Sequence, residues 1–375
     1  MATIGIDCRM YSSRFTGIGR YVYELTRNLF RLDDQNNYVL FFNDPEYDLF
    51  DPPNDRIRKV KVNVPHYSLK EQTKFNRILK RSNLDLMHFT HFNAPILYKK
   101  PSIVTIHDLT LSFYPGKKMT SFLHRMGYHI VIKNAVKNAK KIISVSENTK
   151  RDLQKLMHIP SEKIEVIYEG VDSNFRPITD ETYAMAIKEK LKIDKPYLLY
   201  TGVWRSHKNL KNLINAFSIL KEEYDYDGYL VITGRKDPVY APDILSQTYS
   251  LELHGDIIFT GMVDEMELIA LYGGAQVYVF PSLYEGFGLS PLEAMQCGVP
   301  VAASRSSCIP EVCGEQSALY FNPNDPANMA ETIYSIISDS DLRARLIQSG
   351  LARVKNFSWQ KMTEETLTLY NQTLK

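Results

Sequence analysis

Two glutamates around a glycine turn give the clearest chemical signal in this 375-residue chain. Seven residues separate Glu285 from Glu293, and the first three of them are Gly286, Phe287 and Gly288. The apolar run before the turn is typical of a buried strand, and the residues after it predict a helix. In open α/β folds such a junction binds phosphorylated ligands, because free backbone N–H groups and the helix dipole face the anion. Since the carboxylates can also accept hydrogen bonds from hydroxyls, the pattern indicates a nucleotide or sugar-nucleotide site.

One of the two acids also has a purely structural explanation. Ser290 followed by Pro291 and, three positions after the serine, Glu293 is a helix-start signature with a capping box. Capping and ligand binding therefore both remain open for Glu293. Glu285 lies between a tyrosine and two glycines, where no helix needs a cap and no core accommodates a charge. We predict that Glu285 binds ligand.

Two segments in the first half of the chain hold further candidates. Gly17 and Gly19 follow the first apolar run and open a helical pattern, so the backbone there could approach a phosphate closely, although a tight turn for packing explains them equally well. His107 ends another apolar run, and strand ends in such sheets point into the ligand crevice. We predict a functional role for His107, with Asp108 orienting the imidazole or capping the next turn.

Cations follow similar runs in the second half. Arg205 and Lys208 come after one predicted strand and could neutralise a diphosphate leaving group, the electrostatic effect that dominates such transfers. Charges facing solvent are the alternative. Arg235 and Val263 follow the next two predicted strands and are weaker candidates, placed to contact a nucleotide base.

The elements that position these residues alternate along the whole chain. Short apolar runs rich in β-branched residues are separated by helical patterns such as Ile18–Arg31, Asn209–Lys221 and Glu265–Tyr272. This alternation predicts an α/β fold with doubly wound parallel sheets. The predicted strands are Thr3–Asp7, Tyr38–Phe42, Lys59–Val64, Leu86–Thr90, Ile103–His107, Lys141–Val145, Lys163–Tyr168, Tyr197–Thr201, Tyr229–Thr233, Ile257–Thr260, Val277–Phe280, Val299–Ala303 and Ala318–Phe321.

The length predicts two Rossmann-like domains, because one ordinary core does not reach 375 residues. We place the first domain at residues 1–173 and the second, nucleotide-binding one at 174–357. A last amphipathic helix within 358–375 could pack back on either domain. We expect the site in a central cleft that the two domains face.

Composition points to a cytoplasmic protein. Hydrophobic residues make up 44% and charged residues 23%, as in soluble globular chains. The four cysteines lack zinc-type spacing, which favours free thiols in a reducing compartment. The chain enters a strand at once, leaving no room for a signal peptide, and contains no apolar run of membrane-spanning length.

Charge is distributed unevenly around a net value of +2. Residues 1–175 hold 27 Lys and Arg against 18 Asp and Glu, whereas the remainder holds 18 against 25. The basic half contains two amphipathic stretches, Lys70–Arg81 and Lys117–Lys141, which are either solvated helix faces or contacts to an anionic membrane. A phosphorylated acceptor fits as well, whereas the chain shows no stacking or recognition-helix motif for nucleic acid.

These motifs together resemble family 4 of the retaining, nucleotide-sugar-dependent glycosyltransferases, which have the two-domain GT-B fold. The resemblance runs nearly the full length of the chain, and the Glu-x7-Glu segment is its most specific part. The other matching segments are Gly17–Tyr21, His107–Asp108, Ser144–Glu147, Glu169–Asp172, Lys208–Asn209, Phe280–Met295, Cys297–Pro300 and Pro310–Glu311.

The resemblance implies a role for each site residue. Glu285 and the backbone of Gly286, Phe287 and Gly288 would hold the donor sugar, with His107 beside it. Glu293 would bind the ribose hydroxyls, and the helix start at Leu289 and Ser290 would meet the phosphates. A basic pair such as Arg205 and Lys208 would stabilise the leaving diphosphate.

The chain departs from the family at one cation. Many members carry an arginine where this chain has Val203 or His207, so the assignment of that role to Arg205 is our inference. A DxD-type metal motif is also missing from the sequence, as the GT-B fold implies. We therefore expect neither a metal nor another cofactor, with protein cations replacing a divalent ion.

The resulting hypothesis is retaining transfer of a hexose from a nucleoside diphosphate sugar to a hydroxyl. The overall likeness to polysaccharide mannosyltransferases favours GDP-mannose over UDP-glucose or UDP-galactose. The acceptor would be a glycan or lipid-linked sugar of a cell-surface polysaccharide, at the inner membrane face. Two alternatives are a GT-B nucleotide-sugar 2-epimerase, which the Glu-Gly-Phe-Gly…Glu pattern disfavours, and a non-catalytic sugar-nucleotide-binding subunit.

Overall fold

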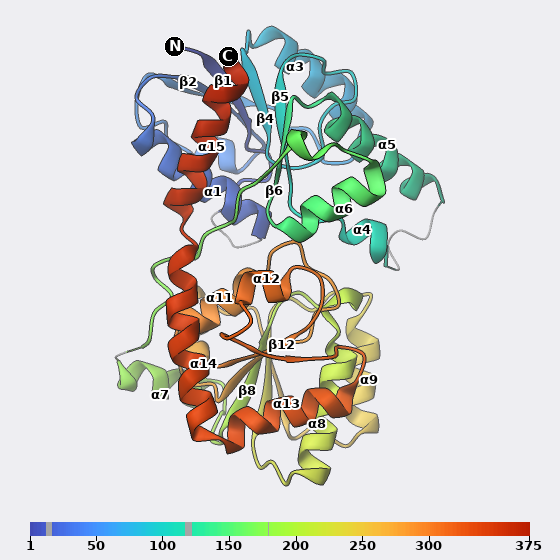
Figure 1. The fold of residues 1–375 in the computed structure, drawn as a ribbon, viewed down its shortest axis with the longest axis vertical. Coiled ribbons are helices and arrows are strands. Elements are labelled where there is room, and N and C mark those ends of the chain that lie inside the picture. The colour runs from blue at the N-terminus through green and yellow to red at the C-terminus, as the bar shows by residue number, and fades with distance from the viewer. Residues whose placement is uncertain (13–16, 117–121, 179) are drawn as a thin grey trace. The chain divides into compact units, whose positions relative to one another are not determined.

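A computed structural model describes the chain except for residues 13–16, 117–121 and 179. The chain forms two compact units, each built on a parallel sheet (Figure 1). Unit 1 comprises Met1–Leu109, Met119–Gly170 and Phe357–Lys375. Unit 2 comprises Thr110–Lys118 and Val171–Asn356.

Unit 1 contains a seven-stranded parallel sheet in the order β3-β2-β1-β4-β5-β6-β7. The five inner strands contain almost only buried residues, which explains why the sequence shows unbroken apolar runs there rather than alternation. The two edge strands, β3 and β7, are mostly exposed or half-buried. Its strands are β1 (Thr3–Asp7), β2 (Asn37–Phe42), β3 (Ile57–Lys61), β4 (Leu86–Phe89), β5 (Ser102–Ile106), β6 (Lys141–Ser144) and β7 (Ile164–Val166).

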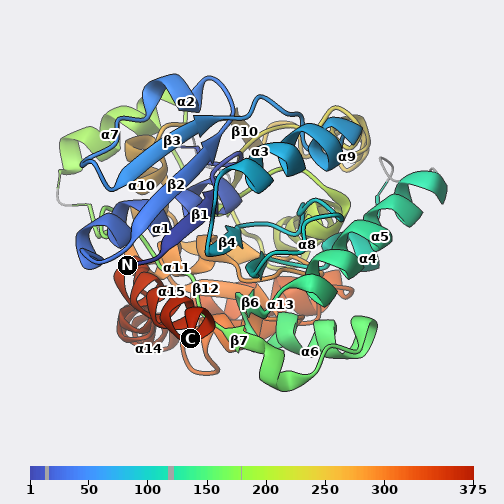
Figure 2. The same ribbon diagram turned by 90° about the horizontal axis from the view of Figure 1, so that it is seen from above.

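The helices of unit 1 include the last one of the chain. Its helices are α1 (Gly17–Leu32), α2 (Glu46–Leu49), α3 (Asn76–Arg81), α5 (Phe122–Asn138), α6 (Glu147–Met157) and α15 (Trp359–Leu374), with the π-helix η1 (Glu71–Phe75) and the 3-10 turn η3 (Ser161–Lys163). Figures 1 and 2 show α15 beside α1. Tyr370 anchors it, because its hydroxyl bonds His88 Nδ1 at 2.6 Å, and His88 Nε2 bonds Thr105 Oγ1 at 2.8 Å. Burial lowers the pKa of His88 to about 3, so this link is neutral.

Unit 2 contains a six-stranded parallel sheet in the order β10-β9-β8-β11-β12-β13. Helices α8 and α13 pack together and against the sheet through a core that includes Phe217 of α8 and Ile333 of α13. Its strands are β8 (Tyr197–Thr201), β9 (Tyr229–Thr233), β10 (Ile257–Gly261), β11 (Val277–Phe280), β12 (Val301–Ser304) and β13 (Leu319–Phe321).

The helices of unit 2 begin with a short segment between β5 and α5. This segment, α4 (Thr110–Phe113), places the Phe113 ring 4.9 Å from the Tyr284 ring. The remaining helices are α7 (Glu181–Lys190), α8 (Leu210–Glu223), α9 (Ala241–Ser250), α10 (Glu265–Gly273), α11 (Leu289–Gln296), α12 (Ile309–Cys313), α13 (Pro326–Ser338) and α14 (Ser340–Arg353), with the 3-10 turns η4 (Ser206–Lys208) and η5 (Val354–Asn356).

Each sheet reverses its winding direction once. In unit 1 the reversal lies between β1 and β4, and in unit 2 between β8 and β11. Because crossovers between parallel strands are right-handed, the reversal places helices on both faces and leaves a crevice at the carboxyl ends of the two strands beside it. The predicted doubly wound fold is confirmed in both units. Across the part of the chain that the structure describes, every helix is too short or too polar to cross a bilayer.

Candidate functional site

The reversal point of unit 2 brings together two predicted site residues. Lys208 belongs to the turn η4 after β8, and Glu285 belongs to the loop after β11. The Lys208 Nζ donates to Glu285 Oε1 at 2.6 Å, and the two side chains are only 21% and 13% exposed. A lysine and a glutamate that the sequence analysis treats separately therefore form one largely buried ion pair.

The surroundings of Glu285 keep its carboxylate charged. Burial raises the pKa of this group, but the charges of Lys208 and His207 and the hydrogen bond from Lys208 lower it further than burial raises it. The net pKa lies below the ordinary glutamate value of 4.5. Glu285 is thus an ionised acceptor at neutral pH, and two of the three N–H groups of the Lys208 ammonium remain for other acceptors.

The helix after the glycine turn begins earlier than the Ser290 cap signature predicts. Gly288 is the N-cap residue of α11 and has a φ of +98°, a left-handed conformation that favours glycine. Helix α11 then starts at Leu289, so Ser290 lies inside its first turn. The predicted capping role of Ser290 is wrong, because the left-handed glycine ends the turn two residues before the serine. The capping-box explanation for Glu293 fails with it.

Glu293 instead ends a chain of buried hydroxyl groups. The Tyr272 hydroxyl donates to Glu293 Oε2 at 3.1 Å and lies 3.2 Å from Thr201 Oγ1, which in turn lies 3.0 Å from the Tyr278 hydroxyl. Burial and the Glu293 carboxylate raise the pKa of Tyr272 well above its ordinary value, so this phenol stays protonated and able to donate. This series of hydroxyl groups fixes one carboxylate oxygen of Glu293 at the carboxyl end of β8.

The remaining predicted residues of unit 2 lie on neighbouring loops. Arg205 and Arg235 are exposed, and Val263 is partly buried after β10. The loops after β8 and β9 touch closely, since a Cβ on Gly234 would lie 2.2 Å from the carbonyl oxygen of Gly202. Both loops therefore lie at the carboxyl edge of the sheet. Arg205, however, does not join the Lys208–Glu285 ion pair.

In unit 1 the imidazole of His107 is held on both sides. Its Nδ1 lies 3.0 Å from Glu169 Oε1, and its Nε2 lies 3.0 Å from the carbonyl oxygen of Thr90. Each ring nitrogen therefore has one oxygen partner, which fixes the orientation of the imidazole. Sequence reasoning noted Glu169 in a motif without linking it to His107. A contact of His107 with the donor sugar, and the cleft between the domains, stay predictions.

The glycines predicted near a phosphate open α1. Gly17 is exposed at the first position of the helix and Gly19 is buried in the first turn. A Cβ at Gly17 would meet no atom within 4 Å, so packing among the described residues does not require a glycine there. Residues 117–121 of the basic stretch Lys117–Lys141 lie outside the described residues.

Sequence reasoning missed a buried charge cluster at the reversal point of unit 1. Arg9, which follows β1, bonds Asp7 Oδ1 at 2.8 Å and Oδ2 at 2.7 Å through Nε and Nη2, and Glu71 Oε1 at 2.5 Å through Nη1. The guanidinium also lies 4.0 Å from the centre of the Phe75 ring. The signal for this cluster was an Asp-x-Arg pair at the end of a buried strand.

Replacing Arg9 by methionine is expected to destabilise unit 1 by about 3–5 kcal/mol, because two buried carboxylates lose their counter-charge. Burial raises the pKa of Glu71 even beside Arg9, so without the arginine Glu71 takes up a proton more readily. Urea unfolding measures the loss, and adding Asp7→Asn and Glu71→Gln should recover most of it. An Arg9→Met variant as stable as the wild type would contradict this account.

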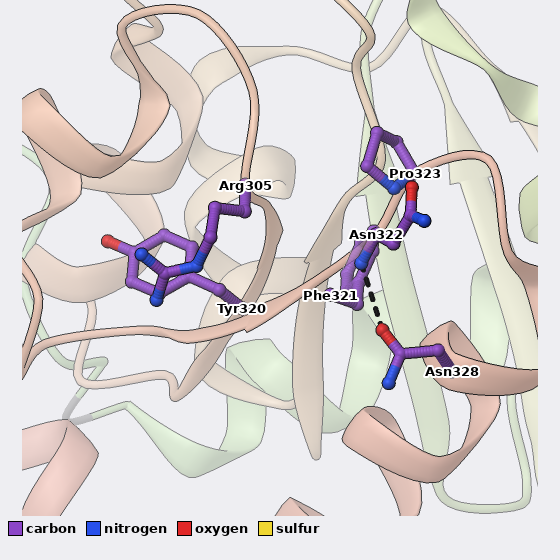
Figure 3. Close-up of a pocket in the computed structure, with 6 residues that line it drawn as sticks. All are labelled: Arg305, Tyr320, Phe321, Asn322, Pro323 and Asn328. Atoms are coloured by element: carbon purple, nitrogen blue, oxygen red, sulfur yellow. Dashed lines mark hydrogen bonds between the residues drawn. The ribbon is translucent and has the colours of Figure 1, made fainter.

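A separate cavity of about 340 Å³ lies at the ends of β12 and β13 (Figure 3). The Arg305 guanidinium lies 4.7 Å from the centre of the Tyr320 ring, and the Asn322 backbone N–H donates to Asn328 Oδ1 at 2.9 Å. Phe321 and Pro323 complete the lining. None of these residues was predicted to bind ligand.

Two Rossmann-like units, each with a doubly wound parallel sheet, form the architecture of the GT-B class of glycosyltransferases. Family models agree over both halves of the chain. The model "Glycosyltransferase Family 4" matches residues 15–175, and "Glycosyl transferases group 1" matches residues 184–353. The chain belongs to glycosyltransferase family 4.

Individual relatives are consistent with this membership. The chain is 26% identical to O-antigen chain mannosyltransferase B of Escherichia coli over 95% of this chain and 96% of that one. It is 32% identical to O-antigen chain mannosyltransferase RfbU of Salmonella typhimurium, over 69% of this chain and 67% of that one. A sucrose-phosphate synthase from Thermosynechococcus elongatus has the same fold, with a TM-score of 0.79, 23% identity and 99% of both chains covered.

Proposed function

We propose that this protein transfers mannose from a nucleoside diphosphate sugar to a hydroxyl of a glycan or lipid-linked acceptor, with retention at the anomeric carbon. The observation that carries the proposal is the Lys208–Glu285 ion pair at the reversal point of unit 2. The choice of mannose rests on the relatives that are named O-antigen mannosyltransferases.

Each charged group has one part in the proposed reaction. The ionised carboxylate of Glu285 accepts hydrogen bonds from hydroxyls of the donor sugar. Lys208 and the N-terminus of α11 stabilise the negative charge that develops on the leaving diphosphate. Glu293 accepts hydrogen bonds from the ribose, and Arg205 is the second cation on the diphosphate. This set needs no metal ion.

A thermal-shift panel tests the donor. GDP, UDP, GDP-mannose, UDP-glucose and UDP-galactose are compared at equal concentration, since a ligand that binds the native state raises the melting temperature. We expect the largest shift from GDP-mannose, with GDP above UDP. A larger shift from a UDP-sugar would contradict GDP-mannose and identify that sugar nucleotide as the donor. No shift from any nucleotide would refute nucleotide-sugar binding.

We further propose that unit 1 acts at the anionic cytoplasmic face of a membrane. Helix α5 exposes Met126 and Ile130, each 44% exposed, beside the exposed Arg125 and Lys133. In the other basic stretch, by contrast, the apolar side chains face the core, since Phe75 is buried and the lysines are exposed. Binding to vesicles with anionic lipid, lost in Met126→Ser/Ile130→Ser, is expected. Equal sedimentation with and without vesicles would refute it.

A further inference from the structure

Four of the five residues Ser304–Cys308, a stretch here named the bracing segment, bond the backbone of the Glu285 loop. The segment runs from the end of β12 into the N-cap of α12, and the loop runs from Ser282 to Phe287. Ser304 Oγ donates to the Ser282 carbonyl at 2.5 Å, and Ser306 Oγ donates to the Leu283 carbonyl. These bonds hold the residues that lead up to Glu285.

The next two residues of the bracing segment bond Glu285 itself. The Glu285 backbone N–H donates to Ser307 Oγ at 3.0 Å. The Cys308 thiol lies 3.2 Å from the Glu285 carbonyl oxygen and 3.1 Å from that of Phe287. The segment therefore engages both backbone polar groups of Glu285, while Lys208 holds its side chain.

The geometry of Ser307 is unusual for its residue type. Its φ is +48°, a left-handed conformation that costs a non-glycine residue about 1 kcal/mol or more. Glycine would relieve this strain but has no hydroxyl to accept the Glu285 N–H. Strain of this kind persists where the surrounding contacts over-determine it.

The Cys308 thiol is suited to donate a hydrogen bond rather than to act as a nucleophile. It is fully buried, and burial together with the charge of Glu285 raises the pKa of its thiol well above the ordinary value. The sulfur therefore keeps its proton and serves as a weak donor between the two carbonyl groups that flank Gly286.

We propose that Ser306, Ser307 and Cys308 are positioning residues that fix the backbone of Glu285 so that its carboxylate meets the donor sugar. The claim that this positioning serves sugar binding rests on the proposed function, because it assigns a role to the sugar-binding glutamate. The claim that the segment holds the loop rests on the five hydrogen bonds alone.

Two variants and one control test the loop directly. Ser307→Ala and Cys308→Ala remove the bonds to Glu285, whereas Arg305→Ala changes an exposed residue of the same segment that pairs with Glu315 and stacks on Tyr320. Hydrogen–deuterium exchange of a peptide covering residues 282–288 is compared among the three. We expect at least tenfold faster exchange at the loop in the first two variants and wild-type exchange in the control. Unchanged exchange in Ser307→Ala and Cys308→Ala would overturn the proposal whatever the enzyme's activity.

Kinetics then test the consequence for transfer. A displaced Glu285 is expected to lower kcat for hydrolysis of the donor by roughly 10- to 100-fold, with the Kd of the free nucleoside diphosphate within twofold of wild type. Cys308→Ser keeps a hydrogen-bond donor at this place and should recover most of the rate that Cys308→Ala loses. If the loss in Cys308→Ala were purely structural, Cys308→Ser would not restore the rate. Faster exchange with an unchanged kcat would overturn the catalytic half. A wild type without activity on any nucleotide sugar would refute the proposed function and leave the exchange result to decide the loop.

Discussion

A Glu285→Gln variant is expected to lose about 100-fold or more of its transfer rate at saturating donor, while it remains folded at the assay temperature. Glutamine keeps the size of the side chain and one acceptor oxygen but removes the charge that pairs with Lys208 at 2.6 Å. Hydrogen bonds to a charged acceptor are roughly twice as strong as neutral ones, and here they act in a site with little solvent. Release of labelled sugar from the donor measures kcat.

The matched control for this variant is Glu315→Gln. Glu315 lies in the same unit and forms an ion pair with Arg305, but its side chain is 63% exposed. Exposed pairs contribute little, so this variant should keep the wild-type rate. A folded Glu285→Gln protein with more than half of the wild-type kcat would contradict a role for Glu285 in the site.

A Lys208→Met variant is expected to lose activity at neutral pH and to change its pH dependence. In the wild type, burial raises the pKa of Glu285, but Lys208 and His207 bring it below 4.5. Without Lys208 only His207 and the hydrogen bond from Ser282 still oppose burial, so we expect the pKa of Glu285 to rise above its ordinary value. The acid limb of the pH–rate profile should then move to higher pH, and the lost cation should lower kcat about 100-fold even where Glu285 is ionised.

The contribution of Glu285 to stability should reverse its pH dependence when the folded pKa of this group changes. In the wild type the folded pKa of Glu285 is below the unfolded value, so the pair stabilises above about pH 4.5 and the contribution is lost as pH falls through the folded pKa. In Lys208→Met we expect the folded pKa to lie above the unfolded value, because burial is the largest single influence on this carboxyl. The contribution is then present at low pH and lost as pH rises, leaving the variant about 3 kcal/mol less stable than wild type at pH 7.

Urea unfolding at pH 4 and pH 7, with pH–rate profiles, measures both effects. Lys208→Arg serves as the control, because it keeps the positive charge beside Glu285 and should retain the acid limb of the wild type. An acid limb in Lys208→Met at the same pH as in the wild type would contradict the proposed coupling of the two residues.

The fold was largely predictable from the sequence because the inner strands of both sheets are buried on both faces. Runs such as Tyr197–Thr201 and Val277–Phe280 contain only residues that a covered parallel strand accepts, and both strands have the predicted bounds. The prediction was less accurate at β3, expected at Lys59–Val64 and found at Ile57–Lys61. Three of the five residues in β3 are charged, so hydrophobicity does not mark its bounds.

The candidate site was predictable residue by residue but not as a set of contacts. Lys208 and Glu285 are 77 positions apart, and only the strand order that makes β8 and β11 neighbours brings them together. The start of α11 depended on the left-handed φ of Gly288, which competes with a good serine cap and is not visible in the sequence. The Arg9 cluster and the Glu169–His107 bond were missed because both join segments at least 62 positions apart.

The most direct test of the central claim follows the fate of the anomeric carbon. The wild-type protein is mixed with the nucleotide sugar that raised its melting temperature most, ¹³C-labelled at that carbon, with water as the acceptor, and NMR spectra are recorded from the first minutes. We predict release of the nucleoside diphosphate and free hexose that first carries the donor's anomeric configuration, with the other anomer growing only as fast as mutarotation. A nucleotide sugar epimerised at carbon 2, a hexose of inverted configuration, or an unchanged donor would contradict retaining transfer.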